Sequence, residues 1–237
     1  LKTLAESSLA PQNQTPTETP TRQPTEYETI LDETRLDEWL NKLERAKLIA
    51  FDTETTSLDY SKAEIVGVSF AVEAGQAAYL PMAHDYPGAP AQLDRTQTLG
   101  KLKRLLEDSS KAKVGHHLKY DSHVLANHGI ALNGIAHDTM LESYVWNSIA
   151  TKHNMDDVAM KYLDVKTIHY EEVAGKGAKQ IPFQEVDIET AAQYAAEDAD
   201  ICLQIHQELI GKLREQEGLY HLYKDIEIPL IGVLTQM

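Results

Sequence analysis

The stretch AFDTETTSL, residues 50–58, closes an apolar run with two carboxylates, Asp52 and Glu54. The run KLIAFDTE is typical of a buried strand, where side chains two residues apart point to one face, about 6.6 Å apart. Two ionised carboxylates that close repel, so an Arg or Lys partner, a shared proton or a hard divalent cation has to offset the charge. No Arg or Lys follows Lys47 within this stretch. Taken alone, however, the pattern favours two solvated acids at a strand end.

The surrounding sequence predicts a layered α/β domain. Leu36, Trp39, Leu40 and Leu43 lie at helical spacing, and Asp32 can cap the first turn. After residue 139 the patterns are nearly all helical, whereas the preceding strands first form a meander and then alternate with helices. We therefore expect a mixed sheet covered by helices. With KLIAFDTE, its strands are AEIVGVSFAV (63–72), QAAYLPM (76–82), KAKVGH (111–116) and GIAHDT (134–139).

Composition and charge narrow the classes of function. The 237 residues carry a formal net charge of −15, which argues against a wide basic surface that grips duplex nucleic acid. If phosphate is handled, bound metal ions are expected to supply the positive charge. No apolar run approaches the roughly 20 residues of a membrane span, and the N-terminus lacks a secretion-signal pattern, so we expect a cytoplasmic location and no membrane partner. The single cysteine, Cys202, is expected to be a buried, inert thiol.

Two further motifs carry candidate site residues. In YAAEDAD (194–200), Tyr194 and Asp198 are four residues apart on the long helix and share a face, surrounded by alanines that let another layer approach closely. The alternative is a solvated acidic stripe, to which we assign Glu197 and Asp200. In VGHHLKYD (114–121), a strand end and a helix start deliver Asp121, although an Asp in a first turn normally complements the helix dipole.

Together these motifs resemble those of the DEDD exonuclease superfamily, in the subgroup with a tyrosine in the third motif. The matching residues are Asp52 and Glu54, then Asp121, then Tyr194 with Asp198. The stretches GIAHDTMLESYVWNS, EEVAGKGAKQ and YAAEDADICLQIH extend the likeness to the proofreading 3′-5′ exonuclease domain of family A bacterial DNA polymerase I. This resemblance implies an RNase H-like fold with a mixed five-stranded sheet. It also implies a flexible linker over 1–25, the exonuclease domain over 26–217 and the start of a polymerase domain over 218–237.

The resemblance implies hydrolysis of single-stranded or mispaired DNA 3′ ends with two divalent ions, Mg²⁺ or Mn²⁺, with Zn²⁺ possible at one site. Asp52 would bridge the ions, Glu54 and Asp198 would hold the ion that activates water, and Asp121 would hold the second ion. Tyr194 would orient the attacking water. The remaining partner is the polymerase domain of the same full-length chain.

The resemblance also implies substrate contacts. Leu58 matches a wedge residue that packs on the terminal base, and Tyr170 matches an aromatic residue that stacks on it; core packing is the alternative for both. His117 stands where the family usually has Asn, and His116 where Gln is common. We expect activity to survive with altered pH dependence near pH 6 to 7.

Two alternative functions remain open at this point. An RNase D-like exoribonuclease uses the same tyrosine-type motifs, and a catalytically silent module could bind primer ends without cleaving them. The stretch AGKGAKQ (174–180) lacks the spacing of a P-loop and is expected to be a flexible loop beside the substrate groove, where Lys176 and Lys179 could meet phosphate.

Overall fold

The protein is described by a computed structural model in which residues 25–236 are placed. Within these residues the strands form one six-stranded mixed sheet, in the order β1-β4-β3-β2-β5-β6. The central strands β2, β3 and β4 are antiparallel, while β1 pairs parallel with β4, and β5 and β6 continue parallel from β2. The strands are β1 (Glu26–Thr29), β2 (Leu48–Thr55), β3 (Ile65–Glu73), β4 (Gln76–Pro81), β5 (Ala112–Gly115) and β6 (Ile135–Asp138).

The expected mixed sheet is confirmed, but its predicted count of five strands is wrong, because β1 adds a sixth. The stretch EYET is short and polar, so it carries no alternating apolar pattern. It is held by backbone pairing at the sheet edge: the Glu26 N–H donates to the Gly75 carbonyl at 2.7 Å. The Tyr27 hydroxyl also donates to Asp200 Oδ2 at 2.8 Å. Apart from Thr25, the predicted linker lies outside the described residues.

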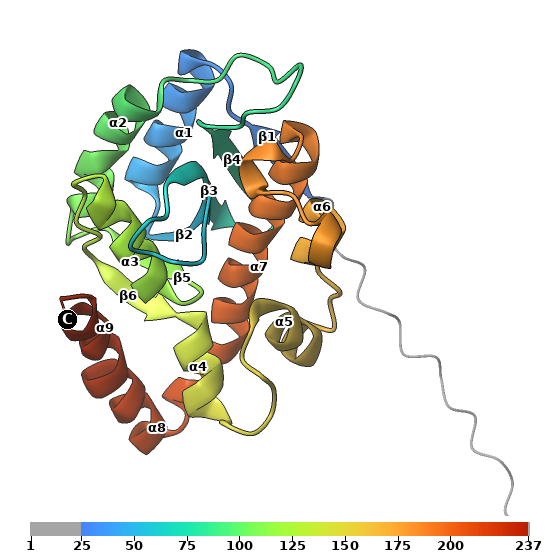
Figure 1. Cartoon of the computed structure of the whole chain (residues 1–237). Helices are drawn as coiled ribbons and strands as arrows, with labels where there is room; N and C mark the ends of the chain where they lie inside the picture. Colours follow the sequence, from blue (N-terminus) through green and yellow to red (C-terminus); the bar gives the residue numbers. More distant parts are fainter. Residues whose placement is uncertain (1–24, 237) are drawn as a thin grey trace, which may run out of the picture.

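Helices cover both faces of the sheet (Figure 1). The first three helices pack on one face with the larger apolar residues of the strands, and the long α7 crosses the other face. The helices are α1 (Glu33–Arg45), α2 (Arg95–Glu107), α3 (Leu118–Asn127), α4 (Thr139–Trp146), α5 (Met155–Leu163), α6 (Tyr170–Ala174), α7 (Ile188–Arg214), α8 (Glu217–His221) and α9 (Ile228–Thr235), with short 3-10 turns η1 (Gly177–Lys179) and η2 (Phe183–Glu185) and a π-helical segment η3 (Leu222–Glu227).

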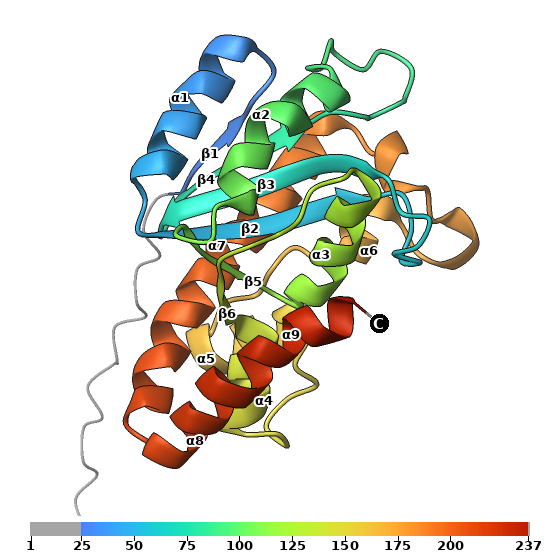
Figure 2. The ribbon, with the colours of Figure 1, turned by 90° about the vertical axis from the view of Figure 1, so that its left-hand side faces the viewer.

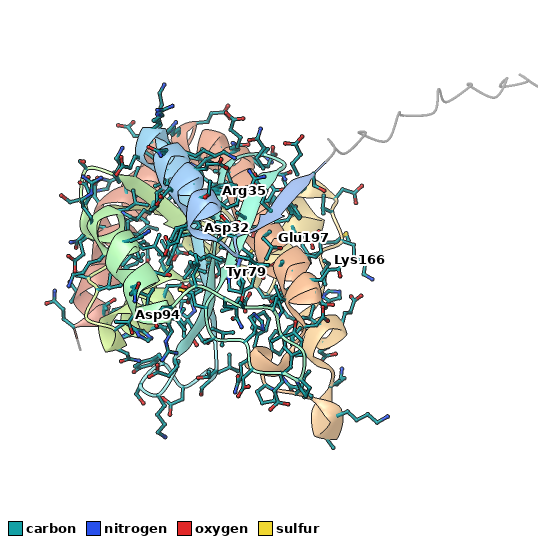
Figure 3. The ribbon with its side chains drawn as sticks, turned by 90° about the horizontal axis from the view of Figure 1, so that it is seen from above. Asp32, Arg35, Tyr79, Asp94, Lys166 and Glu197 are labelled. Atoms are coloured by element: carbon teal, nitrogen blue, oxygen red, sulfur yellow. The ribbon has the colours of Figure 1, made fainter. Side chains whose placement is uncertain are left out.

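Side-chain caps fix where the helices on the first face begin. Asp32 accepts a hydrogen bond from the Arg35 N–H at 2.9 Å, and Asp94 accepts one from the Gln97 N–H at 2.8 Å. Each carboxylate satisfies an N–H that has no partner inside its helix. Asp32, Arg35 and Asp94 lie at the starts of α1 and α2 when the molecule is seen from above (Figure 3). The predicted Asp32 cap is confirmed.

The alternation of β2 decides which way the acidic residues point. Phe51 packs in the core beneath α1, α2 and α3, whereas Ala50 packs beneath α7. Since residues two apart share a face, Asp52 and Glu54 follow Ala50 to the α7 side, and Thr53 follows Phe51 to the α3 side. The pleat of this one strand therefore places the two acids opposite the long helix.

Small residues let α7 lie close to the sheet. Ala196 and Ala199 on α7 pack with Ala50 and other small residues of the strands, and Cys202 in the same cluster is buried as expected. The assignment of Glu197 and Asp200 to a solvated stripe is wrong, since they are 5% and 0% exposed.

Both carboxylates accept backbone hydrogen bonds from other segments. Glu197 accepts one from the Ile168 N–H at 2.7 Å, and Asp200 accepts one from the Gly75 N–H at 2.8 Å. Glu197 on α7 lies near the segment that carries Lys166 and Ile168 (Figure 3). These two acids therefore bind the segments around Ile168 and Gly75 to α7. Helical spacing alone does not indicate such contacts.

The last helices fold back beside α4 and the end of α7 (Figure 2). Tyr223 of η3 is fully buried, and Ile228 and Ile231 of α9 join the same apolar cluster. Residues 218–236 therefore pack on the main body, which leaves the predicted boundary at 217/218 as a prediction. Among residues 25–236, none of the helices is both long and apolar enough for a bilayer crossing.

Candidate active site

Three of the predicted acids converge between β2 and α7. A carboxylate oxygen from each of Asp52, Glu54 and Asp198 lies within 4.8 Å of the other two. We call these three residues the acidic cluster. Glu54 and Asp198 are each 8% exposed, whereas Asp52 is half-buried. Oxygen ligands in this arrangement are those that a hard divalent cation prefers.

Burial and mutual repulsion dominate the electrostatics of the acidic cluster. Burial, followed by the charge of Asp198, raises the pKa of Asp52 to about 8. Burial also raises the pKa of Asp198 to about 8, although hydrogen bonding to Tyr194 lowers it in part. The pKa of Glu54 is raised by burial and then by the charges of Asp52 and Asp198. The cluster therefore retains protons near neutral pH unless positive charge arrives from outside the chain.

Asp121 approaches β2 from α3, on the opposite side from α7. Its Oδ1 accepts hydrogen bonds from the Thr53 N–H at 3.1 Å and from the Thr53 hydroxyl at 2.7 Å. It is 2% exposed, and its pKa is raised by burial and then by the charge of Asp52. The structure therefore brings three predicted ligands into one cluster and places the fourth beside it, held through Thr53.

Tyr194 lies one helical turn before Asp198 and is part of an aromatic group. Its ring meets those of Tyr170 and Phe183, each at a centroid distance of 6.1 Å. Burial and the neighbouring charge of Asp198 raise the pKa of the Tyr194 hydroxyl well above its usual range. The hydroxyl therefore keeps its proton at neutral pH and can donate a hydrogen bond.

A groove of about 860 Å³ runs over the acidic cluster. Leu58 projects from its wall with 93% of its surface exposed, and Tyr170 on the other side is 36% exposed, so neither is a core residue. Exposed apolar side chains beside carboxylates suit a ligand with flat apolar faces and a charged backbone. The groove is lined by Asp52–Leu58, His116, His117, Tyr120, Asp121, Tyr170, Gly177, Gln180–Phe183, Tyr194 and Asp198.

The loop that carries Leu58 is braced by a residue that the motif analysis did not single out. The Tyr120 hydroxyl donates to the Ser57 carbonyl at 2.5 Å and also lies 2.5 Å from Thr55 Oγ1. Tyr120 precedes Asp121 on α3, so one turn of that helix holds both an acid and the loop end. In the sequence, only the position of Tyr120 next to Asp121 could have indicated this role.

His117 occupies a left-handed backbone conformation, with φ 70° and ψ 45°, at the start of α3. Asn and His adopt this conformation far more readily than most residues, which accounts for His at a position where the resembled family has Asn. Burial, followed by Lys119, lowers the pKa of His117. The ring is therefore neutral near pH 7, and the expected change in pH dependence moves to lower pH.

Asp138 is the main positioning residue that the sequence analysis missed. Its carboxylate accepts the N–H groups of His117 at 3.2 Å and Leu118 at 2.8 Å, and also those of Met140 and Leu141. One buried side chain thus ties the start of α3 to the start of α4. An Asp between the strand GIAH and a helix is an N-cap pattern. This pattern could have predicted the cap of α4, but not the hydrogen bonds to the start of α3.

The stretch AGKGAKQ borders the groove as predicted, because Gly177 and Gln180 line the groove. Lys176 in this loop pairs with Glu171 at 2.8 Å, and both are exposed. Contact of Lys176 or Lys179 with phosphate stays a prediction.

Comparison with known proteins assigns the family. A family model described as 3′-5′ exonuclease matches residues 27–214. The chain belongs to the 3′-5′ exonuclease family. DNA polymerase I of Pseudomonas aeruginosa is 55% identical over 222 residues, which are 93% of this chain and 24% of that protein. This chain therefore spans about a quarter of that relative's length.

Solved structures support the fold of this member of the 3′-5′ exonuclease family. Brucella melitensis NrnC covers 90% of the chain with a TM-score of 0.65 and 19% identity, and 92% of NrnC is matched. Escherichia coli RNase D, an exoribonuclease involved in structured RNA processing, covers 90% of the chain with a TM-score of 0.67 and 18% identity, over 51% of its own length. The predicted RNase H-like fold and the resemblance to the DNA polymerase I exonuclease are confirmed.

Proposed function

We propose that the chain is a metal-dependent exonuclease that removes nucleotides from single-stranded or mispaired DNA 3′ ends, as the proofreading part of a DNA polymerase I. The observation that carries the proposal is the acidic cluster at the base of a groove whose rim exposes Leu58 and Tyr170. The 55% identity to a DNA polymerase I supports DNA as the substrate.

The residues present fit divalent cations. Asp52, Glu54, Asp198 and Asp121 would hold two ions, Mg²⁺ or Mn²⁺, with Zn²⁺ possible at one site. When bound, such ions supply hydroxide from water and stabilise charge on the attacking and leaving oxygens of a phosphodiester. The raised pKa values of the acidic cluster support the assignment, because uncompensated carboxylates otherwise keep protons that a cation displaces.

The chain's own residues divide the remaining work. Asp52, Glu54 and Asp198 would hold the ions from the acidic cluster, with Asp52 shared between them, and Asp121 would contribute from α3. The Tyr194 hydroxyl, protonated at neutral pH, would orient the attacking water by donating or accepting a hydrogen bond. These groups would hold and orient the reacting oxygens. Such positioning removes a large part of the activation barrier of a reaction of this kind.

Leu58 and Tyr170 would hold the terminal base between them. Stacking on an aromatic ring accepts any base, and a mispaired end unstacks more cheaply than a paired one, so the groove selects frayed ends without reading sequence. His117 faces the same groove and, being neutral, can donate a hydrogen bond to the substrate. Lys176 and Lys179 would approach the phosphates from the loop.

The organisation of the longer protein is part of the proposal. Residues 26–217 form the exonuclease domain, 218–237 begin the polymerase domain, and 1–25 are a linker. The identity to DNA polymerase I along 93% of the chain and the family match over residues 27–214 support this division. The proposed location is cytoplasmic.

The test is a comparison of substrates of the same sequence. Single-stranded DNA, duplex DNA with a mispaired 3′ end, matched duplex and single-stranded RNA, each labelled at the 5′ end, are incubated with Mg²⁺ or with EDTA. We expect a ladder of shortened DNA in the presence of Mg²⁺ and none in EDTA. Shortening should be fastest for single strands and for duplexes with a mispaired 3′ end. Faster digestion of RNA than of DNA would favour the exoribonuclease. No digestion of any strand, together with no rise in melting temperature with Mn²⁺, would favour the silent module.

A further inference from the structure

A second cluster of ligand-type side chains lies away from the groove, where four elements meet. His137 comes from β6, Glu142 from α4 and His206 from α7, and Tyr223 of η3 covers them. One ligand atom from each of His137, Glu142 and His206 lies within 4.8 Å of the other two. We call these three residues the His–Glu–His cluster.

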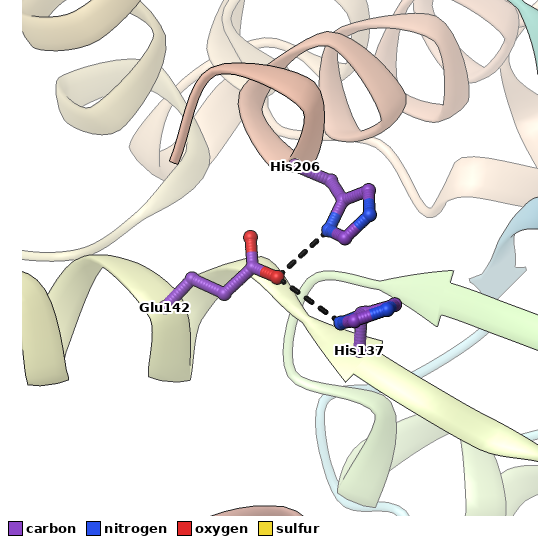
Figure 4. Close-up of side chains that lie close together, drawn as sticks. All are labelled: His137, Glu142 and His206. Carbon is purple, nitrogen blue, oxygen red and sulfur yellow. Dashed lines mark hydrogen bonds and ion pairs between the residues drawn. The ribbon is translucent and has the colours of Figure 1, made fainter. Parts of the chain in front are cut away.

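Both imidazoles aim the same kind of atom at one carboxylate oxygen (Figure 4). His206 Nδ1 lies 2.7 Å from Glu142 Oε1, and His137 Nδ1 lies 3.4 Å from it. The two rings stand beside each other with centroids 4.1 Å apart and a tilt of 41°. Two nitrogens and one oxygen therefore face a common centre from three different elements.

The carboxylate of Glu142 is incompletely satisfied. Its side chain is fully buried, and within residues 25–236 no hydrogen bond reaches Oε2. A buried acceptor without a partner is costly and rare in native structures. Oε1, in contrast, has three neighbours, since the Tyr223 hydroxyl also donates to it at 3.0 Å. The unpartnered oxygen shows that the neighbouring side chains do not fully satisfy this carboxylate, which leaves it with capacity for a further partner.

The surroundings favour a cation over a further hydrogen-bond donor. The His137 side chain is 13% exposed, and its Nδ1 lies 3.4 Å from Glu142 Oε1, so the ring presents a ligand atom to the interior. Two acidic side chains lie at the site: Glu142 itself, and Asp138 at the end of β6, whose backbone N–H donates to the Tyr223 hydroxyl. Neutral imidazole and carboxylate are the ligands of borderline metals such as Zn²⁺ and Co²⁺, whereas Mg²⁺ prefers oxygen alone.

We propose that His137, Glu142 and His206 form a binding site for a borderline transition-metal ion, Zn²⁺ in its simplest form, that ties β6, α4 and α7 together beneath η3. Three protein ligands leave one position of a tetrahedral ion, and the Tyr223 hydroxyl lies beside it, 3.2 Å from His137 Nδ1. The site is structural, because its atoms face the protein interior and not the groove.

Metal binding at this site has a definite proton balance. Each imidazole must present the Nδ1 lone pair, so the proton that His206 Nδ1 donates to Glu142 moves to Nε2 of the same ring; no proton is lost and no electron is transferred. Metal binding therefore replaces the hydrogen bond between His206 and Glu142 by coordination of both groups to the ion. It also fixes the position of η3, the segment that leads into α9.

The experiment measures Co²⁺ binding to the 237-residue chain that carries Asp52→Asn and Asp198→Asn, which disable the acidic cluster. We expect one Co²⁺ per chain, with the intense visible absorption of four-coordinate Co²⁺, displaced by one equivalent of Zn²⁺. At a Co²⁺ concentration about 100 times the dissociation constant, the melting temperature is expected to rise by roughly 5–10 °C.

Variants of the cluster provide the second half of the experiment. In the same background, His137→Phe and His206→Gln are each expected to weaken Co²⁺ binding about 100-fold or more. His123→Gln, a histidine on α3 that stacks on Tyr60, is the matched control and keeps the site. Circular dichroism establishes that each variant is folded, and either cluster variant that folds is sufficient.

Two outcomes would overturn the proposal. The first is that the background chain binds no stoichiometric Co²⁺. The second is that binding survives undiminished in a folded His137→Phe or His206→Gln variant. In both cases the three residues and Tyr223 are a hydrogen-bond network alone. Neither outcome depends on nuclease activity, so the proposal stands or falls apart from the proposed function.

Discussion

The acidic cluster and the His–Glu–His cluster bury carboxylates in opposite ways. In the first, Asp52, Glu54 and Asp198 lie together, burial raises the pKa of all three, and the charges of other cluster members raise those of Asp52 and Glu54 further. In the second, one carboxylate, Glu142, meets two imidazoles and a phenol. The first opens on a large groove, while the second lies beneath η3. Burial alone therefore does not distinguish the two clusters; the groups that each buried carboxylate meets do.

This contrast has an energetic consequence. Like charges in a low-dielectric environment destabilise the folded chain unless protons or cations bind. We therefore expect the acidic cluster to lower the free energy of unfolding when no metal is bound. The hydrogen bonds around Glu142, in contrast, are expected to raise it. Substitutions at the two clusters should differ in sign when stability is measured without metal.

The largest expected effect is on catalysis at the acidic cluster. Asp52→Asn keeps the shape of the side chain but removes the charge, and we expect the exonuclease rate with Mg²⁺ to fall by about 10³-fold or more. In EDTA at pH 8 the same variant should melt at a higher temperature than the unmodified chain, because one repelling charge is gone. Rates on a single strand and melting curves on the same preparation check both.

Glu142→Gln is the matched control for this substitution at the other cluster. It removes the same charge from a carboxylate that accepts donated hydrogen bonds, so the variant should melt at a lower temperature than the unmodified chain in EDTA. If both substitutions change stability in the same direction, the contrast between the clusters is wrong.

The second prediction concerns pH. The folded pKa values of Asp52 and Asp198 are about 8, above the value of about 3.9 for an unfolded Asp. A folded state that holds its protons more tightly gains stability that is fully present below pH 4 and is lost as the pH rises to about 8. In EDTA, the advantage of Asp52→Asn/Asp198→Asn over the unmodified chain should therefore grow between pH 5 and pH 8.5.

Saturating Mg²⁺ should reduce that advantage, because the cation takes the place of the protons. The measurement is the difference in melting temperature between the two proteins across the pH range, with and without Mg²⁺. A melting-temperature difference that does not change with pH would show that folding does not raise the pKa values of Asp52 and Asp198. The proposed repulsion within the acidic cluster would then be wrong.

The two clusters also differ in how far sequence predicts them. The period of two along β2 predicts that Asp52 and Glu54 share a face, and the helical spacing predicts that Tyr194 and Asp198 do, because both relations are local. His137, Glu142 and His206 meet only through tertiary packing, so no spacing in the sequence brings them together.

The same physical reason explains the errors. β1 is a strand because an edge of β4 is available, not because EYET is apolar. Glu197 and Asp200 are buried because backbone N–H groups of Ile168 and Gly75 approach them from distant segments. Asp138 likewise holds two helix starts that only the folded sheet brings together. Local periodicity predicts which face a residue occupies, and long-range packing decides what it meets there.

A third prediction, of intermediate size, uses the groove that only the acidic cluster has. Leu58→Ala removes an apolar side chain that is expected to cover the terminal base, and we expect about a tenfold lower rate on single-stranded DNA at limiting substrate. Ile149→Ala is the matched control: Ile149 is 91% exposed, as Leu58 is 93% exposed, but it follows α4, the helix that carries Glu142. Equal rates for the two variants would remove Leu58 from the substrate site.

The smallest expected effect is at the edge of the His–Glu–His cluster. Burial raises the pKa of the Tyr223 hydroxyl, so it stays protonated; it donates to Glu142 Oε1 at 3.0 Å and accepts from the Asp138 N–H at 3.1 Å. Tyr223→Phe loses both bonds without changing the shape of the ring, at a cost of about 1–2 kcal/mol, or a melting temperature lower by roughly 2–8 °C. Tyr144→Phe, where the hydroxyl belongs to a side chain that is 51% exposed, should change it little. Because Tyr223 lies outside the groove, the exonuclease rate per folded molecule should stay within about twofold; a larger loss would mean that the two clusters act on each other, through Asp138 and the start of α3.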